Sequence, residues 1–181
     1  MELNYLESGY SKIAEQNWHG AINDFSQFIE SNPNNDEGYV LRGIIKAVLE
    51  DNLEALNDFN KAIEVRPDND KTYHHRAVLN VSIKNYEGAI ADYSKAVEIN
   101  PLNEKTYNSR GVIYSTTQEY LKAVKDFDDA IVLKPDFAEA YYNRGMARFH
   151  LNQRNGCFLD LYKARELGNR DATEEIKKHY K

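Results

Sequence analysis

The segment EKTYNSRGVIYSTTQEYLKAVKDFDDAIVLKPDF, residues 104–137, contains one copy of a pattern that recurs along the whole chain. Its proline, Pro135, is preceded by Pro33, Pro67 and Pro101, and the four prolines lie at intervals of 34 residues. A fixed period of this length indicates that one supersecondary unit is repeated and stacked. The 181-residue chain is therefore predicted to be a repeat protein.

Several other positions recur in the same register when each unit is numbered from Glu2, Asp36, Asp70, Glu104 and Ala138. The fourth is a tyrosine, at Tyr5, Tyr39, Tyr73, Tyr107 and Tyr141; the eighth is small, at Gly9, Gly43, Ala77, Gly111 and Gly145; the twentieth is small and the twenty-fourth bulky. Residues four apart share one face of a helix. Glycine inside a helix costs about 1 kcal/mol relative to alanine. Its recurrence predicts that two helices approach closely at the eighth position.

Each unit thus contains two helices, which are expected at about 2–15 and 18–31, 36–49 and 52–65, 70–83 and 86–99, 104–117 and 120–133, and 138–151 and 154–167. Proline ends the second helix because it lacks the next backbone donor. Asn35, Asn69 and Asn103 follow the prolines and are suitable N-caps for the next helix. A shorter helix at about 170–181, with Ala172, Ile176 and Tyr180 on one side, is expected to cap the array.

The recurring frame, Tyr-x2-[Arg/Ser]-[Gly/Ala] followed by Ala-x3-[Phe/Tyr/Leu] and Pro, resembles the tetratricopeptide repeat over about residues 2–169. The resemblance implies an all-α fold, a right-handed α-solenoid of five helix-turn-helix repeats plus a C-terminal capping helix, in a single domain spanning 1–181. The repeats would lie at about 2–35, 36–69, 70–103, 104–137 and 138–169, with the cap at about 170–181. The chain departs from the family in having arginine at the seventh position of four units and Asn169 in place of the fifth proline.

Those arginines, at Arg42, Arg76, Arg110 and Arg144, are matched by an aspartate at the twenty-third position of every unit. The first unit has Ser8 at the seventh position and has no preceding unit. We therefore expect each aspartate to pair with the basic residue of the next unit, from Asp24 with Arg42 to Asp160 with Lys178. The alternative is that the arginines form a ladder for an anionic ligand.

The net charge of −6 and the pI near 5.4 argue against nucleic acid as the partner, because binding to phosphates requires clustered Lys and Arg. The single cysteine, Cys157, excludes a disulfide framework and is expected to be a packing residue. No apolar run is long enough for membrane insertion. The first residues lack the regions of a secretory signal, so we expect a cytoplasmic location.

The sequence contains no phosphate-binding glycine loop, dinucleotide fingerprint or zinc-protease motif. His74 and His75 are adjacent and therefore point to different parts of a helix surface, which does not favour a metal site. We expect a protein without enzymatic activity, with no catalytic residues, no metal site and no cofactor.

The resemblance implies a concave groove lined by the first helices of the repeats. The residues that it places there and that we select as candidates for peptide binding are Leu6, Tyr10, Ile13, Leu41, Ile44, Lys71, His74, His75, Lys105, Asn108, Tyr142 and Asn143. The alternative for these residues is that the aliphatic side chains pack between repeats and that the lysines are merely solvated. Chaperone-binding members of the family use a clamp for a terminal carboxylate, of which only Lys105 is present here.

The sequence therefore predicts a non-enzymatic protein–protein interaction module that binds a peptide or helix of a partner protein in this groove. The alternative is structural self-association, in which the repeat surface joins copies of the chain into a homo-oligomeric scaffold. The identity of the partner cannot be read from the fold.

Overall fold

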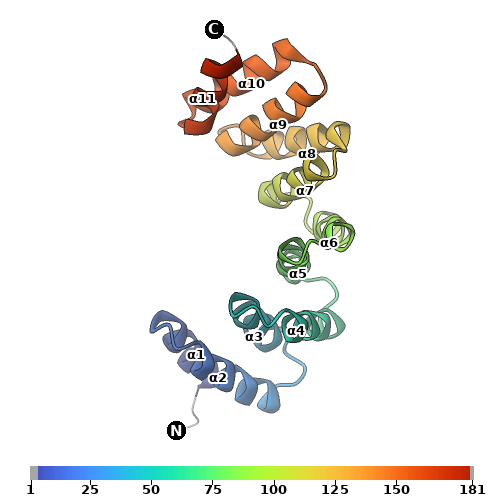
Figure 1. Ribbon diagram of the computed structural model, residues 1–181. Coiled ribbons are helices and arrows are strands. Elements are labelled where there is room, and N and C mark those ends of the chain that lie inside the picture. The colour runs from blue at the N-terminus through green and yellow to red at the C-terminus, as the bar shows by residue number, and fades with distance from the viewer. Residues whose placement is uncertain (1–3, 180–181) are drawn as a thin grey trace. The chain divides into compact units, whose positions relative to one another are not determined.

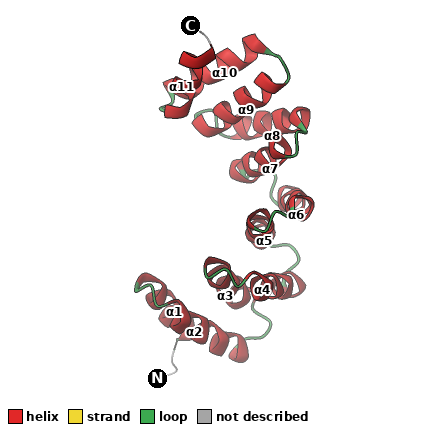
Figure 2. Cartoon of the chain, in the orientation of Figure 1, coloured by secondary structure: helices red, strands yellow, loops and turns green. Residues whose placement is uncertain are grey.

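The computed structural model describes residues 4–179, and every regular element in that range is an α-helix (Figure 2). The helices are α1 (Tyr5–Ala14), α2 (Trp18–Ser31), α3 (Asp36–Val48), α4 (Asn52–Val65), α5 (Asp70–Ser82), α6 (Tyr86–Ile99), α7 (Glu104–Thr116), α8 (Tyr120–Leu133), α9 (Ala138–His150), α10 (Arg154–Glu166) and α11 (Arg170–His179). The all-helical prediction is confirmed, and most helix ends lie within one residue of the expected ones. Glu2, Leu3 and Tyr180, which were expected in the terminal helices, lie outside the described residues.

Contacts between Cα atoms divide the chain between Asn85 and Tyr86 into two parts that are larger than a repeat. We call them unit 1, which contains α1–α5, and unit 2, which contains α6–α11 (Figure 1). Within each unit, every helix packs against the next one along the chain. The strongest packing joins the two helices of one repeat, as in α3 with α4, α7 with α8 and α9 with α10. The expectation of a single domain stays a prediction.

The predicted close packing at the eighth position is present, although the partner is a side chain rather than a helix backbone. A Cβ atom added to Gly111 would lie 2.7 Å from the ring of Phe127, and one added to Gly9 would lie 2.4 Å from Phe25. Both phenylalanines are fully buried. The small residue on the first helix therefore makes room for the aromatic ring that the second helix of the same repeat inserts into the core.

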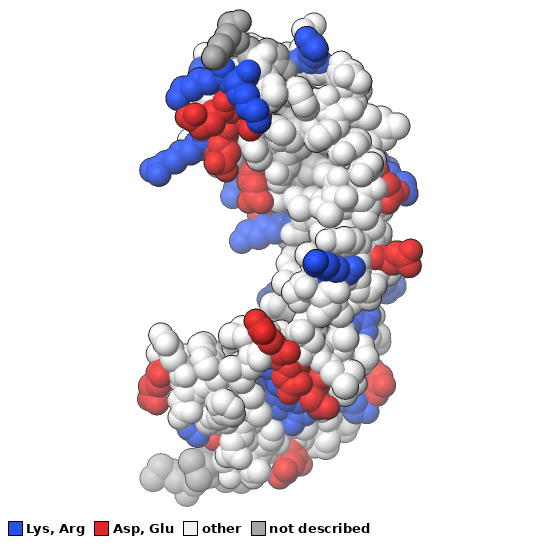
Figure 3. Space-filling model, in the orientation of Figure 1, with Lys and Arg blue, Asp and Glu red and all other residues white. Residues whose placement is uncertain are grey.

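The caps also agree with the sequence. The side chains of Asn35, Asn69 and Asn103 accept hydrogen bonds from backbone amides in the first turns of α3, α5 and α7. In the fifth repeat Phe137 occupies the cap position and provides no such bond. The helix α11 behaves as the expected cap: Ala172 is buried and Ile176 packs against the cluster of Leu161. Charged side chains of both signs gather over this helix (Figure 3).

The turn between the paired helices contains a feature that the sequence did not indicate. Non-glycine residues with positive φ occur once per repeat, 34 residues apart, with φ between 58° and 63°, at Gln16, Glu50, Lys84, Gln118 and Asn152. This left-handed conformation favours glycine, which is absent at all five positions. Each of these residues ends the first helix of its pair in a Schellman-type turn, in which the next backbone amide donates to the carbonyl five residues earlier, as Asn17 does to Lys12 and Asp51 to Lys46.

The predicted pairing of aspartates with the next repeat is wrong. Arg42 donates two hydrogen bonds, of 2.9 and 2.7 Å, to the carboxylate of Asp58 in its own repeat. Arg110 binds Asp126 and Arg144 binds Asp160 in the same bidentate way. The reason is the helix hairpin, which places the seventh position of the first helix opposite the twenty-third position of the second. Lys178 is instead 3.6 Å from Glu175.

A third hydrogen bond from each of these arginines, and one from Arg76, reaches the preceding repeat. Nη1 of Arg42 lies 3.0 Å from Oγ of Ser26, and Nη1 of Arg110 lies 3.1 Å from Oγ of Ser94. Nη1 of Arg76 reaches Asn60 and that of Arg144 reaches Asp128, both at 2.5 Å. We call this set of bonds the arginine bridge. Because the guanidinium donors are engaged within the protein, they do not support a ladder for an external anion.

The eleventh position, one turn after the seventh, provides a cation in three repeats, and in two of them it is a second cation beside the arginine. Lys46 lies 2.9 Å from Asp58 and Arg148 lies 2.7 Å from Asp160. In the first repeat, which has Ser8 in place of arginine, Lys12 lies 2.7 Å from Asp24. Burial would raise the pKa of Asp24, but hydrogen bonds from Lys12 and Ser8 and the charge of Lys12 together lower it.

Replacement of Arg110 by methionine is expected to destabilise the protein more than the same replacement of Arg42. In both variants a buried aspartate loses its bidentate partner, a change that costs about 3–5 kcal/mol when no other cation is near. Lys46 remains beside Asp58, whereas the eleventh position of the fourth repeat is Tyr114. The free energies of unfolding in urea of Arg42→Met and Arg110→Met test this order. A larger loss in Arg42→Met would contradict the role assigned to Lys46.

Candidate functional site

The first helices of unit 1 enclose a hollow of about 640 Å³ whose walls come from α1, α3 and α5. A second hollow adjoins it and shares Ile44 and His75 with it. We call the two together the trough. The residues that line it include Tyr10, Asp36, Glu37, Val40, Leu41, Ile44, Val48, Phe59, Arg66, Asn69, Lys71, His75 and Val78. The trough thus lies on the helix faces that the sequence predicted to line a groove.

One end of the trough is polar and lies near the N-termini of α3 and α5. The phenol of Tyr10 donates a hydrogen bond of 3.1 Å to Oε1 of Glu37, across from α1 to α3. Burial is the main cause of the raised pKa of Tyr10, and the bond to Glu37 raises it further. Lys71, on α5, is exposed. The tyrosine and the glutamate therefore fix one wall, and the lysine amine extends from the other.

The other end is apolar and lies near the C-termini of α3 and α5. Val48 is 59% exposed and Val78 is 50% exposed, although apolar side chains on helices usually face the core. Between the two ends, the ring of His75 lies parallel to that of Phe59, with a centroid distance of 6.3 Å. Burial lowers the pKa of His75, and the charges of His74 and Lys71 lower it further. His75 is therefore a neutral aromatic surface at pH 7.

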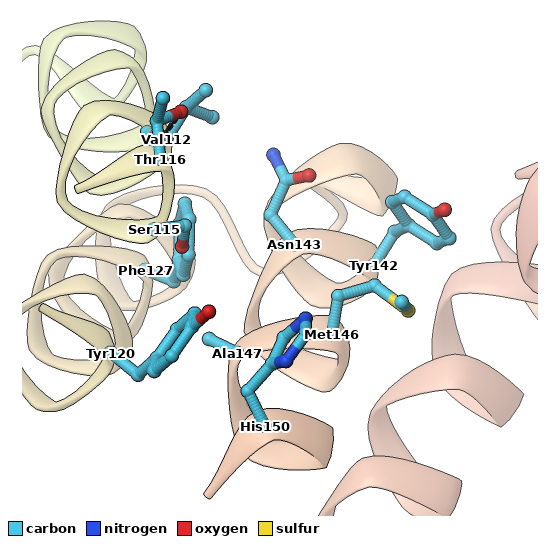
Figure 4. Close-up of a pocket in the computed structure, with 10 residues that line it drawn as sticks. All are labelled: Val112, Ser115, Thr116, Tyr120, Phe127, Tyr142, Asn143, Met146, Ala147 and His150. Atoms are coloured by element: carbon cyan, nitrogen blue, oxygen red, sulfur yellow. Dashed lines mark hydrogen bonds between the residues drawn. The ribbon is translucent and has the colours of Figure 1, made fainter. Parts of the chain in front are cut away.

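Unit 2 has a separate pocket of about 260 Å³, which Figure 4 shows between α7, α8 and α9. Met146, Tyr142, Asn143 and His150 on α9 face Val112, Ser115 and Thr116 on α7 across it. At its lower edge the ring of Tyr120 stacks on that of His150 at 4.6 Å. The walls are mostly apolar or aromatic, so the pocket is suited to an uncharged side chain.

Asn143 is held in place at the edge of this pocket by a chain of amide hydrogen bonds. Its Nδ2 donates to Oδ1 of Asn108 at 3.1 Å, and Nδ2 of Asn108 donates to Oε1 of Glu139 at 3.1 Å. Asn108 is buried, with 5% of its surface exposed. Asn108 therefore orients Asn143 rather than facing the pocket itself.

The structure brings some of the predicted residues together and separates others. Tyr10, Leu41, Ile44, Lys71 and His75 line the trough, and Tyr142 and Asn143 line the pocket. Leu6 and Ile13 pack against the core cluster of Phe25, as the alternative for the aliphatic side chains proposed. His74 lies beside His75, and Lys105 is exposed; neither lines a hollow described here.

Tyr120 and Phe127, which line the pocket, were missed because they belong to the second helix of their repeat. The pattern of the sequence assigns that helix to the core and provides no signal that its aromatic rings reach the first-helix face. Among residues 4–179, no three His, Cys, Asp or Glu side chains are arranged to hold a metal ion. None of the described helices has the length and apolar character that a membrane span requires.

Comparisons with known proteins agree with this architecture. A family model described as "TPR repeat" matches residues 80–118, and one described as "Tetratricopeptide repeat" matches residues 104–137. No curated protein matches the chain.

Three solved structures illustrate the similarity of fold. A crystal structure of MamA is 22% identical with a TM-score of 0.82, over 98% of this chain and 94% of that one. MamA from Desulfovibrio magneticus is 19% identical with a TM-score of 0.81, over 90% and 92%. YrrB, described as "a TPR protein with an unusual peptide-binding site", is 19% identical with a TM-score of 0.81, over 98% and 92%. These likenesses show the fold, an all-α solenoid of helix-pair repeats.

The half-buried His75 is expected to make the protein less stable in acid. Its pKa is lowered in the folded state, so the unfolded chain binds the proton first, and stability is lost as the pH falls below about 6.5 and through the folded pKa. In His75→Phe, the ring contact with Phe59 is kept and the proton is not bound. The free energy of unfolding of the variant should therefore decrease less than that of the wild type between about pH 7.5 and 5. Parallel pH profiles would contradict the burial of His75.

Proposed function

The chain is a tetratricopeptide repeat protein, and we propose that it is a non-enzymatic interaction module that binds a segment of a partner protein. The observation that carries the proposal is the trough on α1, α3 and α5. Its exposed valines, Val48 and Val78, lie on helix faces that nothing in unit 1 covers within the described residues. Exposed apolar surface in a hollow is typical of a protein-binding site.

The proposed binding residues are those of the earlier prediction that line a hollow: Tyr10, Leu41, Ile44, Lys71 and His75 in the trough and Tyr142 and Asn143 in the pocket. Asn108 would act by orienting Asn143. The fold is shared with YrrB, whose description names a peptide-binding site. That likeness supports a peptide or a helix as the form of the ligand.

Matched substitutions of exposed apolar residues test this proposal. A variant with Val48→Glu and Val78→Glu places two charges in the trough, whereas Leu53→Glu and Val132→Glu place two on second helices, where these side chains are 70% and 78% exposed. All four sites are exposed, so both variants should keep their helicity by circular dichroism. The wild type and the second variant should retain the same partner from cell extract, and the trough variant should lose it. Equal retention by both variants would exclude the trough.

A second candidate, self-association, is favoured by one observation. Leu121 forms a shallow hollow with Tyr120 and Leu151 where α8 begins, and this surface is apolar and exposed. If it joins two copies, sedimentation equilibrium should show a mass that rises with concentration, and Leu121→Lys should restore the monomer mass. A monomer mass at every concentration in the wild type would exclude this candidate.

A further inference from the structure

Three of the four charged side chains at the polar end of the trough already have partners within the protein. Asp36 is 8% exposed, accepts a hydrogen bond of 2.6 Å from Asn69 and lies 3.8 Å from Arg66. Glu37 accepts the bond from Tyr10. Lys71 is therefore the one of these four side chains that has no partner among the described residues.

Lys71 is exposed and has no carboxylate within 4.0 Å among the described residues. Its backbone amide is bound by Asn69 in the first turn of α5, where the positive end of the helix dipole adds to the charge of the amine. The positive charge at this end of the trough does not follow from composition, because the sequence of unit 1 has fourteen acidic and eight basic residues. The trough therefore presents an unpaired cation in an acidic part of the chain.

The apolar end continues along the same helix face. Lys71, His75 and Val78 follow one another at spacings of four and three residues, so their side chains share one side of α5. Seven residues of helix advance by about 10 Å. A segment in the polyproline II conformation covers that length in about three residues, at about 3.1 Å each, and side chains three residues apart lie on the same face of it.

We propose that the trough selects a partner segment with an acidic side chain about three residues away from an apolar one, the carboxylate at Lys71 and the apolar side chain at Val48 and Val78. This inference rests on the proposed function and adds the chemistry of the ligand. The carboxylate makes a charge-assisted hydrogen bond to the amine of Lys71. The apolar side chain covers the two exposed valines and Ile44.

Selection from a random peptide display library tests the inference without a known partner. The immobilised proteins are the wild type, Lys71→Glu, the control Lys84→Glu and the trough variant Val48→Glu with Val78→Glu. Lys84 is an exposed lysine of the same unit outside the trough. Peptides selected by the wild type and by Lys84→Glu should be enriched in acidic residues at the stated distance from an apolar one. Lys71→Glu should select basic residues at that place instead.

The affinity for a resynthesised peptide that the wild-type protein selected measures how much Lys71 contributes to binding. Lys71→Gln should weaken it about tenfold, the size expected for one hydrogen bond between charged groups, and Lys84→Gln should leave it unchanged. Glu37→Gln should strengthen it, because it removes the carboxylate of the polar end that has no cation beside it, while keeping an acceptor for Tyr10. A variant that merely disturbed the fold would weaken binding in every case.

The outcomes separate the two proposals. The inference would be overturned if the wild type selected peptides that the trough variant does not select but that show no enrichment in acidic residues. It would also be overturned if Lys71→Glu selected peptides with the same acidic enrichment as the wild type. Either result would leave the proposed function standing. If the wild type selects no peptide, or if the trough variant selects the same peptides as the wild type, the proposed function fails with the inference.

Discussion

The arginine bridge is the interaction on which the other features of this protein depend. A single guanidinium binds the buried aspartate of its own repeat with two donors and the preceding repeat with a third, as in Arg42 with Asp58 and Ser26. The first pair of bonds fixes the two helices of a hairpin, and the third fixes that hairpin against its neighbour. Planar geometry with donors in a fork makes this possible, and lysine could not replace it.

The bridge occupies one side of the first helices that contain the arginine, and another side faces the hollows, where Val40 and Ile44 also pack against the core. In α3, Arg42 and Lys46 hold Asp58, while Val40, Ile44 and Val48 face the trough. The same division is found in α9, where Arg144 and Arg148 hold Asp160 and Met146 and His150 face the pocket. The stabilising residues can therefore stay constant while the hollow surfaces differ between repeats.

The sequence predicted the helices, the asparagine caps and the position of the small residues, because these depend on local geometry and on a strict period. It predicted the wrong partner for each aspartate, since a period shows which positions recur but not which helices face one another. The absence of arginine at Ser8 was misread for the same reason: Lys12, one turn later, reaches the same aspartate. Of the twelve first-helix residues selected for the candidate site, seven line a hollow. Val48 and Val78 were not among those selected, and Tyr120 required the packing of two helices to be known.

The turns of the hairpins have a consequence for how this protein can be modified. Each has one non-glycine residue in the left-handed conformation, which costs about 1–2 kcal/mol for an L-amino acid. Glu50 is one of these residues, is exposed and lies outside the trough. The chain thus retains conformational strain at a position that does not itself line its candidate binding surface. Thermal tolerance could therefore be raised through the turns while ligand selectivity is redesigned independently on the first helices.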